Sequence, residues 1–139
     1  MILLSGGFDP LHVGHVRMIR EAHGYGRVIV AVNSDAWLMR KKHYVFMPWD
    51  DRAEILSALK VEVTSVDDSD GTVCSALRRP GLMYFGNGGD RTTANPKEHE
   101  VCVRLGIKEV FGLGGGKVRS SSELVRNARV LHFTTKIGG

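Results

Sequence analysis

Short runs of β-branched and other apolar residues alternate with segments of helical spacing along this 139-residue chain. This alternation constrains the fold more than any other feature, because it is typical of a parallel sheet whose strands are joined by helices. The expected strands are residues 2–5, 27–33, 61–66, 82–85 and 107–111. We therefore predict an α/β fold with five strands, and we expect ligands at the carboxyl ends of those strands.

Helices are expected between the strands. Apolar residues follow a helical spacing after the first strand, and we expect Gly24 and Gly26 to close that helix. Further helices are expected from Pro48, around 72–77, from Pro96 and from Ser120, and the Pro96 helix offers three residues for burial: Val101, Val103 and Leu105. The chain shows no internal repeat, low-complexity segment or linker, so we predict a single domain spanning residues 1–139.

The composition and net charge of the chain limit the binding partners and the cellular compartment that we expect. Hydrophobic residues make up 42% and charged residues 24%, and no apolar run approaches the length of a membrane span. The apolar opening at 1–4 lacks a basic leader and ends at Gly6, so we expect no signal peptide, reduced Cys74 and Cys102, and a cytoplasmic location. The net charge of +4 suits a polyphosphate ligand. Because the basic residues are scattered, we expect no nucleic-acid partner and no membrane partner.

The turn after the first strand, residues 6–15, carries the strongest functional signal. Gly6 and Gly7 allow a phosphate to approach the backbone closely. His12 and His15 are three residues apart and can share one side of a helix N-terminus, which attracts anions. Gly14 leaves room for a base or ribose. Together these residues could hold a triphosphate and stabilise charge on leaving pyrophosphate.

Each part of this turn has a simpler interpretation. A histidine is often structural, a glycine pair often marks only a turn, and His-x-x-His can belong to a metal site. No third ligand stands out nearby in the sequence, and the joint placement of these residues on one strand-to-helix turn favours the phosphate interpretation.

The segment Gly7-Phe8-Asp9, followed by His12-Val13-Gly14-His15, resembles the G-x-F-D-x-x-H-x-G-H signature of the cytidylyltransferase-like nucleotidyltransferase superfamily. That family includes glycerol-3-phosphate cytidylyltransferases and heptose-1-phosphate adenylyltransferases. The resemblance implies a doubly wound, Rossmann-like domain with strand order 3-2-1-4-5. It also implies transfer of a nucleoside monophosphate from CTP or ATP, with His12 and His15 as catalytic residues, Phe8 and Asp9 in the nucleotide site, and a homodimer.

Other segments resemble further parts of the family. The basic run 40–42 lies where members place a phosphate-contacting lysine, so Lys41 and Lys42 are catalytic candidates, although a solvated loop is the alternative. Arg52 matches an ordering arginine of the family, or is purely structural. The stretch after the fourth strand resembles a G-G-D turn and adds nucleotide-binding candidates: Asn87, Gly89 and Asp90. Here too a structural turn is the alternative.

The serine-rich stretch 120–122 resembles the family's I-S-T-T or I-S-S-T motif. Serines are ordinary helix N-caps, and Glu123 could complete a capping box with Ser120. Three hydroxyls near two cations nevertheless favour a phosphate cradle of five residues: Lys117, Arg119, Ser120, Ser121 and Ser122. The family's cytidylyltransferases carry an arginine several residues earlier, where this chain has glycine, so the sequence leaves CTP and ATP open.

The resemblance implies an acceptor that is a phosphorylated small molecule, such as a sugar, polyol or alcohol phosphate. Its candidate contacts are Asp35, Asp68 and Arg91, although the acidic stretch 67–70 could equally be a solvated loop. Mg²⁺ is expected to arrive with the nucleotide, without a dedicated metal site, and Asp9 and Asp90 are the candidates to touch it. The alternatives are an adenylyltransferase of cofactor synthesis, of the nicotinamide-mononucleotide or pantetheine-phosphate type, and a non-catalytic nucleotide sensor.

Overall fold

A computed structural model describes residues 1–88, 95–115 and 120–128. Its five strands are β1 (Ile2–Gly6), β2 (Val28–Val32), β3 (Glu62–Ser65), β4 (Tyr84–Gly88) and β5 (Lys108–Leu113). All neighbouring strands are parallel and their order is β3-β2-β1-β4-β5, which confirms the predicted α/β sheet and its order. The switch in order between β1 and β4 creates the crevice in which such folds bind ligands.

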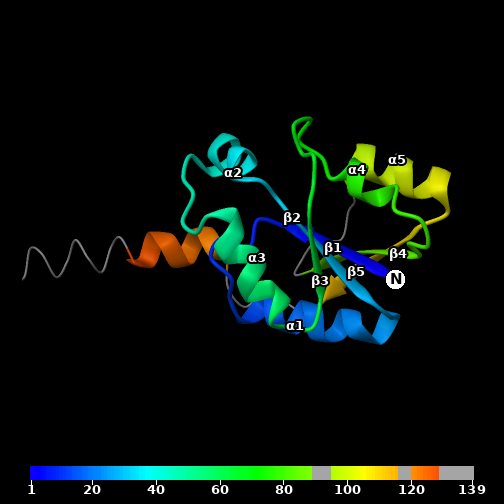
Figure 1. Cartoon of the computed structure of the whole chain (residues 1–139), viewed down its shortest axis with the longest axis horizontal. Helices are drawn as coiled ribbons and strands as arrows, with labels where there is room; N and C mark the ends of the chain where they lie inside the picture. Colours follow the sequence, from blue (N-terminus) through cyan, green and yellow to red (C-terminus); the bar gives the residue numbers. More distant parts are fainter. Residues whose placement is uncertain (89–94, 116–119, 129–139) are drawn as a thin grey trace, which may run out of the picture.

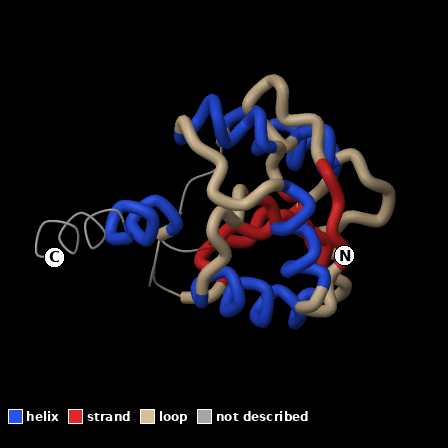
Figure 2. Tube along the Cα trace, turned by 60° about the vertical axis from the view of Figure 1, so that its left-hand side comes forward, coloured by secondary structure: helices blue, strands red, loops and turns tan. Residues whose placement is uncertain are grey.

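Two helical layers cover the sheet. One contains α1 (Val13–Ala22) and α3 (Trp49–Ser57), and the other contains α4 (Cys74–Leu77) and α5 (Pro96–Leu105). Figure 1 shows α1 below the strands and α4 and α5 above them, and Figure 2 shows the red strands between blue helices. Alternate residues of β1 and β2 enter two separate cores, so both strands read as continuous apolar runs.

Several predicted boundaries shift. The expected fourth and fifth strands run further toward their carboxyl ends, to Gly88 and Leu113. The first helix ends at Ala22, followed by a 3-10 turn, η1 (His23–Tyr25), which Gly26 closes at φ +120°. The burial expected of Val103 and Leu105 is wrong: they are 67% and 49% exposed, because α5 turns its other side toward the sheet.

One helix was not predicted from the sequence. Residues that were interpreted as a basic loop form α2 (Asp35–Lys42). Its apolar pattern is weak, but the Ser34 hydroxyl caps it by accepting a hydrogen bond from the Trp37 amide at 3.0 Å. Leu38 is fully buried, and the basic last turn complements the negative end of the helix dipole. These capping and charge signals were available in the sequence.

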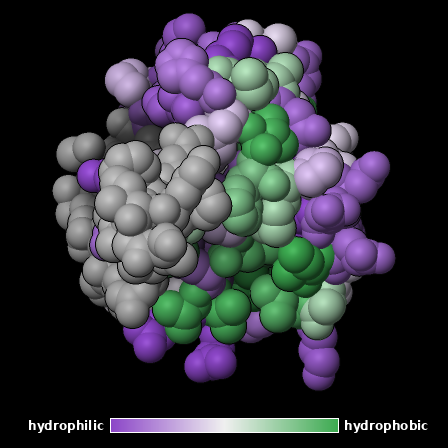
Figure 3. Space-filling view, turned by 90° about the vertical axis from the view of Figure 1, so that its left-hand side faces the viewer, coloured by the Kyte–Doolittle hydropathy of each residue, from purple (hydrophilic) through white to green (hydrophobic). Residues whose placement is uncertain are grey.

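No helix in the described part of the chain combines the length and apolar character needed to cross a membrane. Figure 3 shows a band of hydrophobic residues on the side of the molecule that carries α2 and α3. The large hydrophobic residues exposed on or between these two helices are Met39, Phe46 and Ile55. Both cysteines are free thiols, and Cys102 is buried.

Candidate active site

The turn between β1 and α1 is held in an unusual backbone conformation. Phe8 has a φ of +51°, a backbone conformation that residues other than glycine rarely adopt. Its ring is buried and lies edge-to-face with the His15 ring, with 4.8 Å between the ring centroids. A Cβ at Gly6 would lie 3.3 Å from the Phe8 ring, and one at Gly7 would lie 3.0 Å from Leu38. Close packing against Phe8 and Leu38 is therefore a sufficient reason for glycine at positions 6 and 7, whether or not a phosphate approaches them.

The two histidines form a reciprocal cap at the start of α1. Nδ1 of His12 accepts a hydrogen bond from the Gly14 amide at 3.1 Å, and Nδ1 of His15 accepts one from the His12 amide at 3.2 Å. Their rings stack with centroids 3.8 Å apart. The imidazoles therefore lie on one side of the helix start, as the spacing predicted.

This cap decides which ring nitrogen carries the proton. A backbone N–H can only donate, so Nδ1 of each ring is an acceptor and a neutral ring carries its proton on Nε2. Burial, followed by the charges of His12 and Lys42, lowers the pKa of His15 from 6.5 to about 3. At neutral pH, His15 is thus an uncharged hydrogen-bond donor through Nε2.

Gly14 has a different role from the one expected. A Cβ at this position would lie 2.9 Å from Cε1 of His12, so the space is filled by the imidazole of the protein itself. The glycine is required by the close approach of His12 in its capping position. The space at Gly14 that was expected to admit a base or ribose is therefore occupied by the His12 ring.

Asp9 points into the protein. Its carboxylate is fully buried, and its two oxygens accept hydrogen bonds from the amides of Phe46 and Met47 at 2.7 and 2.5 Å. This arrangement fixes the segment after α2 against the histidine turn. Burial lowers the pKa of Lys42, while the charge of Asp9 opposes that shift, so Lys42 lies within electrostatic reach of the same carboxylate. Asp9 is better placed to position this segment than to bind Mg²⁺ directly.

Arg52 ties four segments together. Its guanidinium is fully buried and donates hydrogen bonds to three carbonyl oxygens, those of Gly7, Asn33 and Met47, at 2.7, 2.8 and 2.9 Å. It also donates to the carboxylate of Asp35 at 2.6 Å. The structural interpretation of Arg52 is the one that this geometry supports. Asp35 is the counter-ion of Arg52, which weakens its candidacy as an acceptor contact.

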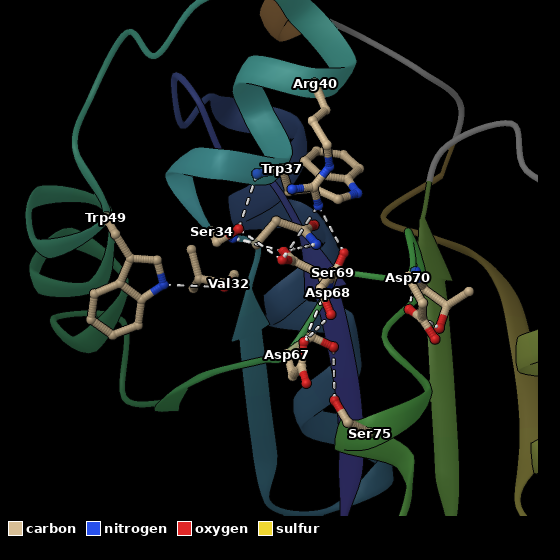
Figure 4. A network of polar contacts seen from close by, with 12 residues as sticks. Val32, Ser34, Trp37, Arg40, Trp49, Asp67, Asp68, Ser69, Asp70 and Ser75 are labelled. Carbon is tan, nitrogen blue, oxygen red and sulfur yellow. Dashed lines mark hydrogen bonds and ion pairs between the residues drawn. The ribbon is translucent and has the colours of Figure 1, made fainter.

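Asp68 joins the ends of β2 and β3. Figure 4 shows its side chain directed at Ser34, with Arg40 close to it. The carboxylate accepts hydrogen bonds from the Asn33 side chain and from both the amide and the hydroxyl of Ser34, at 2.7 to 3.0 Å. Burial would raise the pKa of Asp68, but these hydrogen bonds outweigh it and hold the pKa below its ordinary value. Asp68 is neither a solvated loop residue nor open to an acceptor.

The turn after β5 packs against α1, and the serine-rich segment contacts the turn between β1 and α1. Gly114 packs so closely against α1 that a Cβ would lie 2.8 Å from the Met18 amide nitrogen. Residues 121–128 are helical, and the Ser121 hydroxyl donates to the carbonyl oxygen of Pro10 at 2.8 Å. Ser120 caps this helix by accepting a hydrogen bond from the Glu123 amide at 3.0 Å. The helix 121–128 is therefore joined to the turn between β1 and α1 through Ser121.

A basic cleft of about 330 Å³ lies where this helix meets the end of α2. Its lining comprises Lys41, Lys42, Tyr44, Ser122, Val125 and Arg126. Three cationic side chains and a hydroxyl in one cleft suit the oxygens of a polyphosphate. One of the cations, Lys42, is close enough to His15 for its charge to lower the pKa of that imidazole. Tyr44 and Arg126 were not predicted from the sequence. Arg126 follows Ser122 by four residues, a helical spacing that could have revealed it.

The cytidylyltransferase-like family model matches residues 3–112 of the chain. This chain belongs to the cytidylyltransferase-like family. Among its relatives in that family, FAD synthase of Thermococcus onnurineus (strain NA1) is 35% identical over 109 residues, which are 75% of this chain and 67% of the relative. The bifunctional protein HldE of Rhodopseudomonas palustris (strain HaA2) is 33% identical over 129 residues, 90% of this chain.

The match covers 26% of that HldE protein, so the chain spans about a quarter of its length. The fold is shared with a lipopolysaccharide core biosynthesis protein from Thermoplasma volcanium GSS1, with a TM-score of 0.65, 19% identity and coverage of 84% of this chain and 97% of the other. The family match and the relatives confirm the prediction of a nucleotidyltransferase.

The remaining predicted site residues divide into two groups. Five of them lie outside the described residues: Gly89, Asp90, Arg91, Lys117 and Arg119. Asn87 is described, lies near the carboxyl end of β4 and is only 7% exposed. Among the described residues, no group of three or more His, Cys, Asp or Glu side chains could hold a metal ion.

Proposed function

We propose that this chain transfers a nucleoside monophosphate from CTP or ATP to a phosphorylated sugar, polyol or alcohol. An oxygen of the acceptor phosphate attacks the α-phosphorus, a diphosphate bond forms, and the bond to the leaving pyrophosphate breaks. The observation that carries this proposal is the fixed pair of imidazoles, whose Nδ1 atoms are occupied by backbone amides. Lys42, which lines the basic cleft, lies within electrostatic reach of His15.

The residues contribute by position and charge. An uncharged Nε2–H donor on His15 can stabilise negative charge on the reacting phosphates without first losing a proton. In this proposal Lys41, Lys42 and Arg126 neutralise the pyrophosphate and Ser122 donates a further hydrogen bond, which is supported by their common position in the basic cleft. No enzyme nucleophile is needed, because positioning and electrostatics account for transfers of this kind.

Mg²⁺ would enter with the triphosphate and supply charge neutralisation on its oxygens. The buried carboxylate of Asp9 is already engaged by two amides, so it fits a positioning role better than that of a metal ligand. We therefore keep the expectation of Mg²⁺ bound by phosphate oxygens without a dedicated protein site.

Similarity to an FAD synthase supports adenylyl transfer in cofactor synthesis as the second candidate, because FAD contains an AMP unit joined through a diphosphate. The test is pyrophosphate release from CTP, ATP, GTP and UTP with a panel of acceptors. The panel contains sugar 1-phosphates, glycerol 3-phosphate, FMN, nicotinamide mononucleotide and phosphopantetheine. Turnover with one nucleotide and one acceptor is expected. Tight nucleotide binding without turnover on any acceptor would favour a sensor.

His15→Ala is expected to lower turnover about a hundredfold or more, since a transition-state donor is lost. His23→Ala is the matched control, because His23 is an exposed histidine at the other end of α1. Near-normal turnover in a folded His15→Ala protein would contradict the assigned role.

We further propose that the enzyme works in the cytoplasm as a homodimer. Two free thiols fit a reducing compartment, and the exposed apolar residues Met39, Phe46 and Ile55 offer surface for pairing. A monomeric mass by light scattering at assay concentration would contradict the dimer.

A further inference from the structure

Helix α2 has few apolar contacts to fix its position. Of its eight residues only Leu38 is buried, and Met39 beside it is 50% exposed. A helix this short is marginal in isolation, and most helices in proteins are held by the packing of an apolar face, which α2 does not have. Polar contacts with the rest of the protein therefore have to determine where α2 lies.

The position of α2 matters because its last turn carries two cations of the basic cleft. Lys41 and Lys42 line that cleft. Lys42 is half-buried, its charge reaches His15, and the charge of Asp9 reaches it in turn. Misplacing a catalytic group by about 1 Å can lower a rate about a hundredfold, so the last turn of α2 needs a firm attachment.

Asp68, three residues after β3, holds the first turn of α2. Its carboxylate accepts hydrogen bonds from the Ser34 amide at 2.8 Å and from the Ser34 hydroxyl at 2.7 Å. The same hydroxyl caps α2 by accepting a hydrogen bond from the Trp37 amide. A hydroxyl has one hydrogen to donate and lone pairs to accept, so donating that hydrogen to Asp68 turns a lone pair toward Trp37. The carboxylate and the helix cap therefore support each other.

Asp68 also holds the last turn of α2, through Arg40. Nη2 of Arg40 donates a hydrogen bond to the carbonyl oxygen of Asp68 at 2.9 Å, and it lies 4.0 Å from Oδ1 of the carboxylate. Figure 4 shows the side chains of Ser34 and Arg40 both directed at Asp68. One residue thus contacts the N-cap and the last turn of the same helix, and Arg40 immediately precedes the two lysines.

Asp68 is itself firmly placed. The residue is 4% exposed, and its carboxylate accepts a third hydrogen bond, from the side chain of Asn33 just after β2, at 3.0 Å. Hydrogen bonds to an ionised carboxylate are roughly twice as strong as those between neutral groups. Asp68 therefore attaches α2 to the ends of β2 and β3.

The neighbouring carboxylates have local partners. Asp67 accepts hydrogen bonds from the amide and hydroxyl of Ser69, and Asp70 accepts them from the amide and hydroxyl of Thr72. These bonds stay within one loop, and both aspartates are exposed. Among the hydrogen bonds of the described residues, Asp68 is the one of these three acids that reaches α2, so its neighbours offer a matched control.

We propose that Asp68 is a positioning residue for pyrophosphate. It does not touch the ligand; by holding Ser34 and Arg40 it fixes α2, and α2 places the ammonium group of Lys42 in the basic cleft. This inference rests on the proposed function for the identity of the ligand. A positioning role differs from simple stabilisation of the fold, because its effect on binding depends on the presence of Lys42.

The test is a double-mutant cycle on pyrophosphate binding. Inorganic pyrophosphate with Mg²⁺ is titrated calorimetrically into the whole chain as wild type, Asp68→Ala, Lys42→Ala and the double variant. Asp67→Ala is the matched control, since it removes an exposed carboxylate one residue away. Thermal melting verifies that each protein is folded. Asp68→Asn keeps the size of the side chain and an oxygen that can accept from the Ser34 amide, and it takes the place of Asp68→Ala in the cycle if the alanine variant does not fold.

We expect Asp68→Ala to weaken pyrophosphate binding about tenfold in the wild-type background and less than about threefold in the Lys42→Ala background. Asp68→Asn should weaken binding about threefold in the wild-type background and leave it unchanged in the Lys42→Ala background, because it retains part of the contact with Ser34. The Asp67→Ala control should change the affinity less than about twofold.

Equal losses in the two backgrounds would overturn the assignment, since Asp68 would then not act through Lys42. So would unchanged affinity in the folded Asp68 variants, an equal loss in the Asp67→Ala control, or no binding of pyrophosphate by the wild type. A wild type that binds pyrophosphate in the expected pattern but releases none from any nucleotide would refute the proposed function and leave the role of Asp68 intact.

Discussion

The lowered pKa of His15 makes a quantitative prediction about stability. In the folded protein this imidazole titrates near pH 3, whereas its ordinary value is 6.5. Below pH 6.5 the unfolded chain binds a proton that the folded chain does not, so acid favours unfolding. The stabilisation from His15 is complete above that pH and is lost progressively as the pH falls toward 3.

The size of the effect follows from linkage. Each pH unit between the two pKa values costs about 1.4 kcal/mol of unfolding free energy. Between pH 7 and pH 5 the loss attributable to His15 is therefore about 2 kcal/mol. A pKa of about 4 for His15 in the folded protein, in place of about 3, would hardly change this figure. In either case the folded protein binds almost no proton at His15 between pH 7 and pH 5.

The assay is urea unfolding at several pH values between 7 and 5, on the wild type and on His15→Gln. Glutamine at the third position of a helix can keep the bond to the His12 amide, so the variant retains the cap and removes only the titration. We expect the wild type to lose about 2 kcal/mol more than the variant over this range. Equal losses in the two proteins, or an NMR titration of His15 with a pKa near 6.5, would refute the reasoning.

Arg52→Met and Gly14→Ala test the framework of the site, and Arg40→Met is the control for the first of them. Arg52→Met should cost about 3 to 5 kcal/mol of unfolding free energy, because three buried carbonyls and Asp35 lose their donor. Arg40→Met, which removes a half-exposed guanidinium, should cost less than about 1 kcal/mol of unfolding free energy. Similar losses in the Arg52 and Arg40 variants would contradict the structural role assigned to Arg52. Gly14→Ala should lower turnover about tenfold or more, because the added methyl group displaces the His12 ring. Alanine is the better helix former, so we expect the melting temperature measured by calorimetry not to fall. Unaltered turnover would show that the ring position is not required.

Much of the fold was determined locally and could be predicted from the sequence. The strands at 2–6 and 28–32 are apolar runs bounded by turns, and the parallel arrangement places the turn after each strand at one edge of the sheet. The histidine pair could be placed for the same reason, because its three-residue spacing at a helix start fixes which side both rings share. The start of α5 was equally clear, with Pro96 in its first turn.

The roles of the carboxylates and of Arg52 were decided only by the tertiary structure. Asp9 is bound by amides 37 and 38 residues away, and Asp68 by groups 34 and 35 residues away, so no local pattern could show that they are occupied. Whether an acidic side chain is available to a ligand depends on the donors that surround it, and these come from segments distant in the sequence. The unpaired amide of Asn87 is the converse case, since only the packing around it leaves a buried donor without a partner among the described residues.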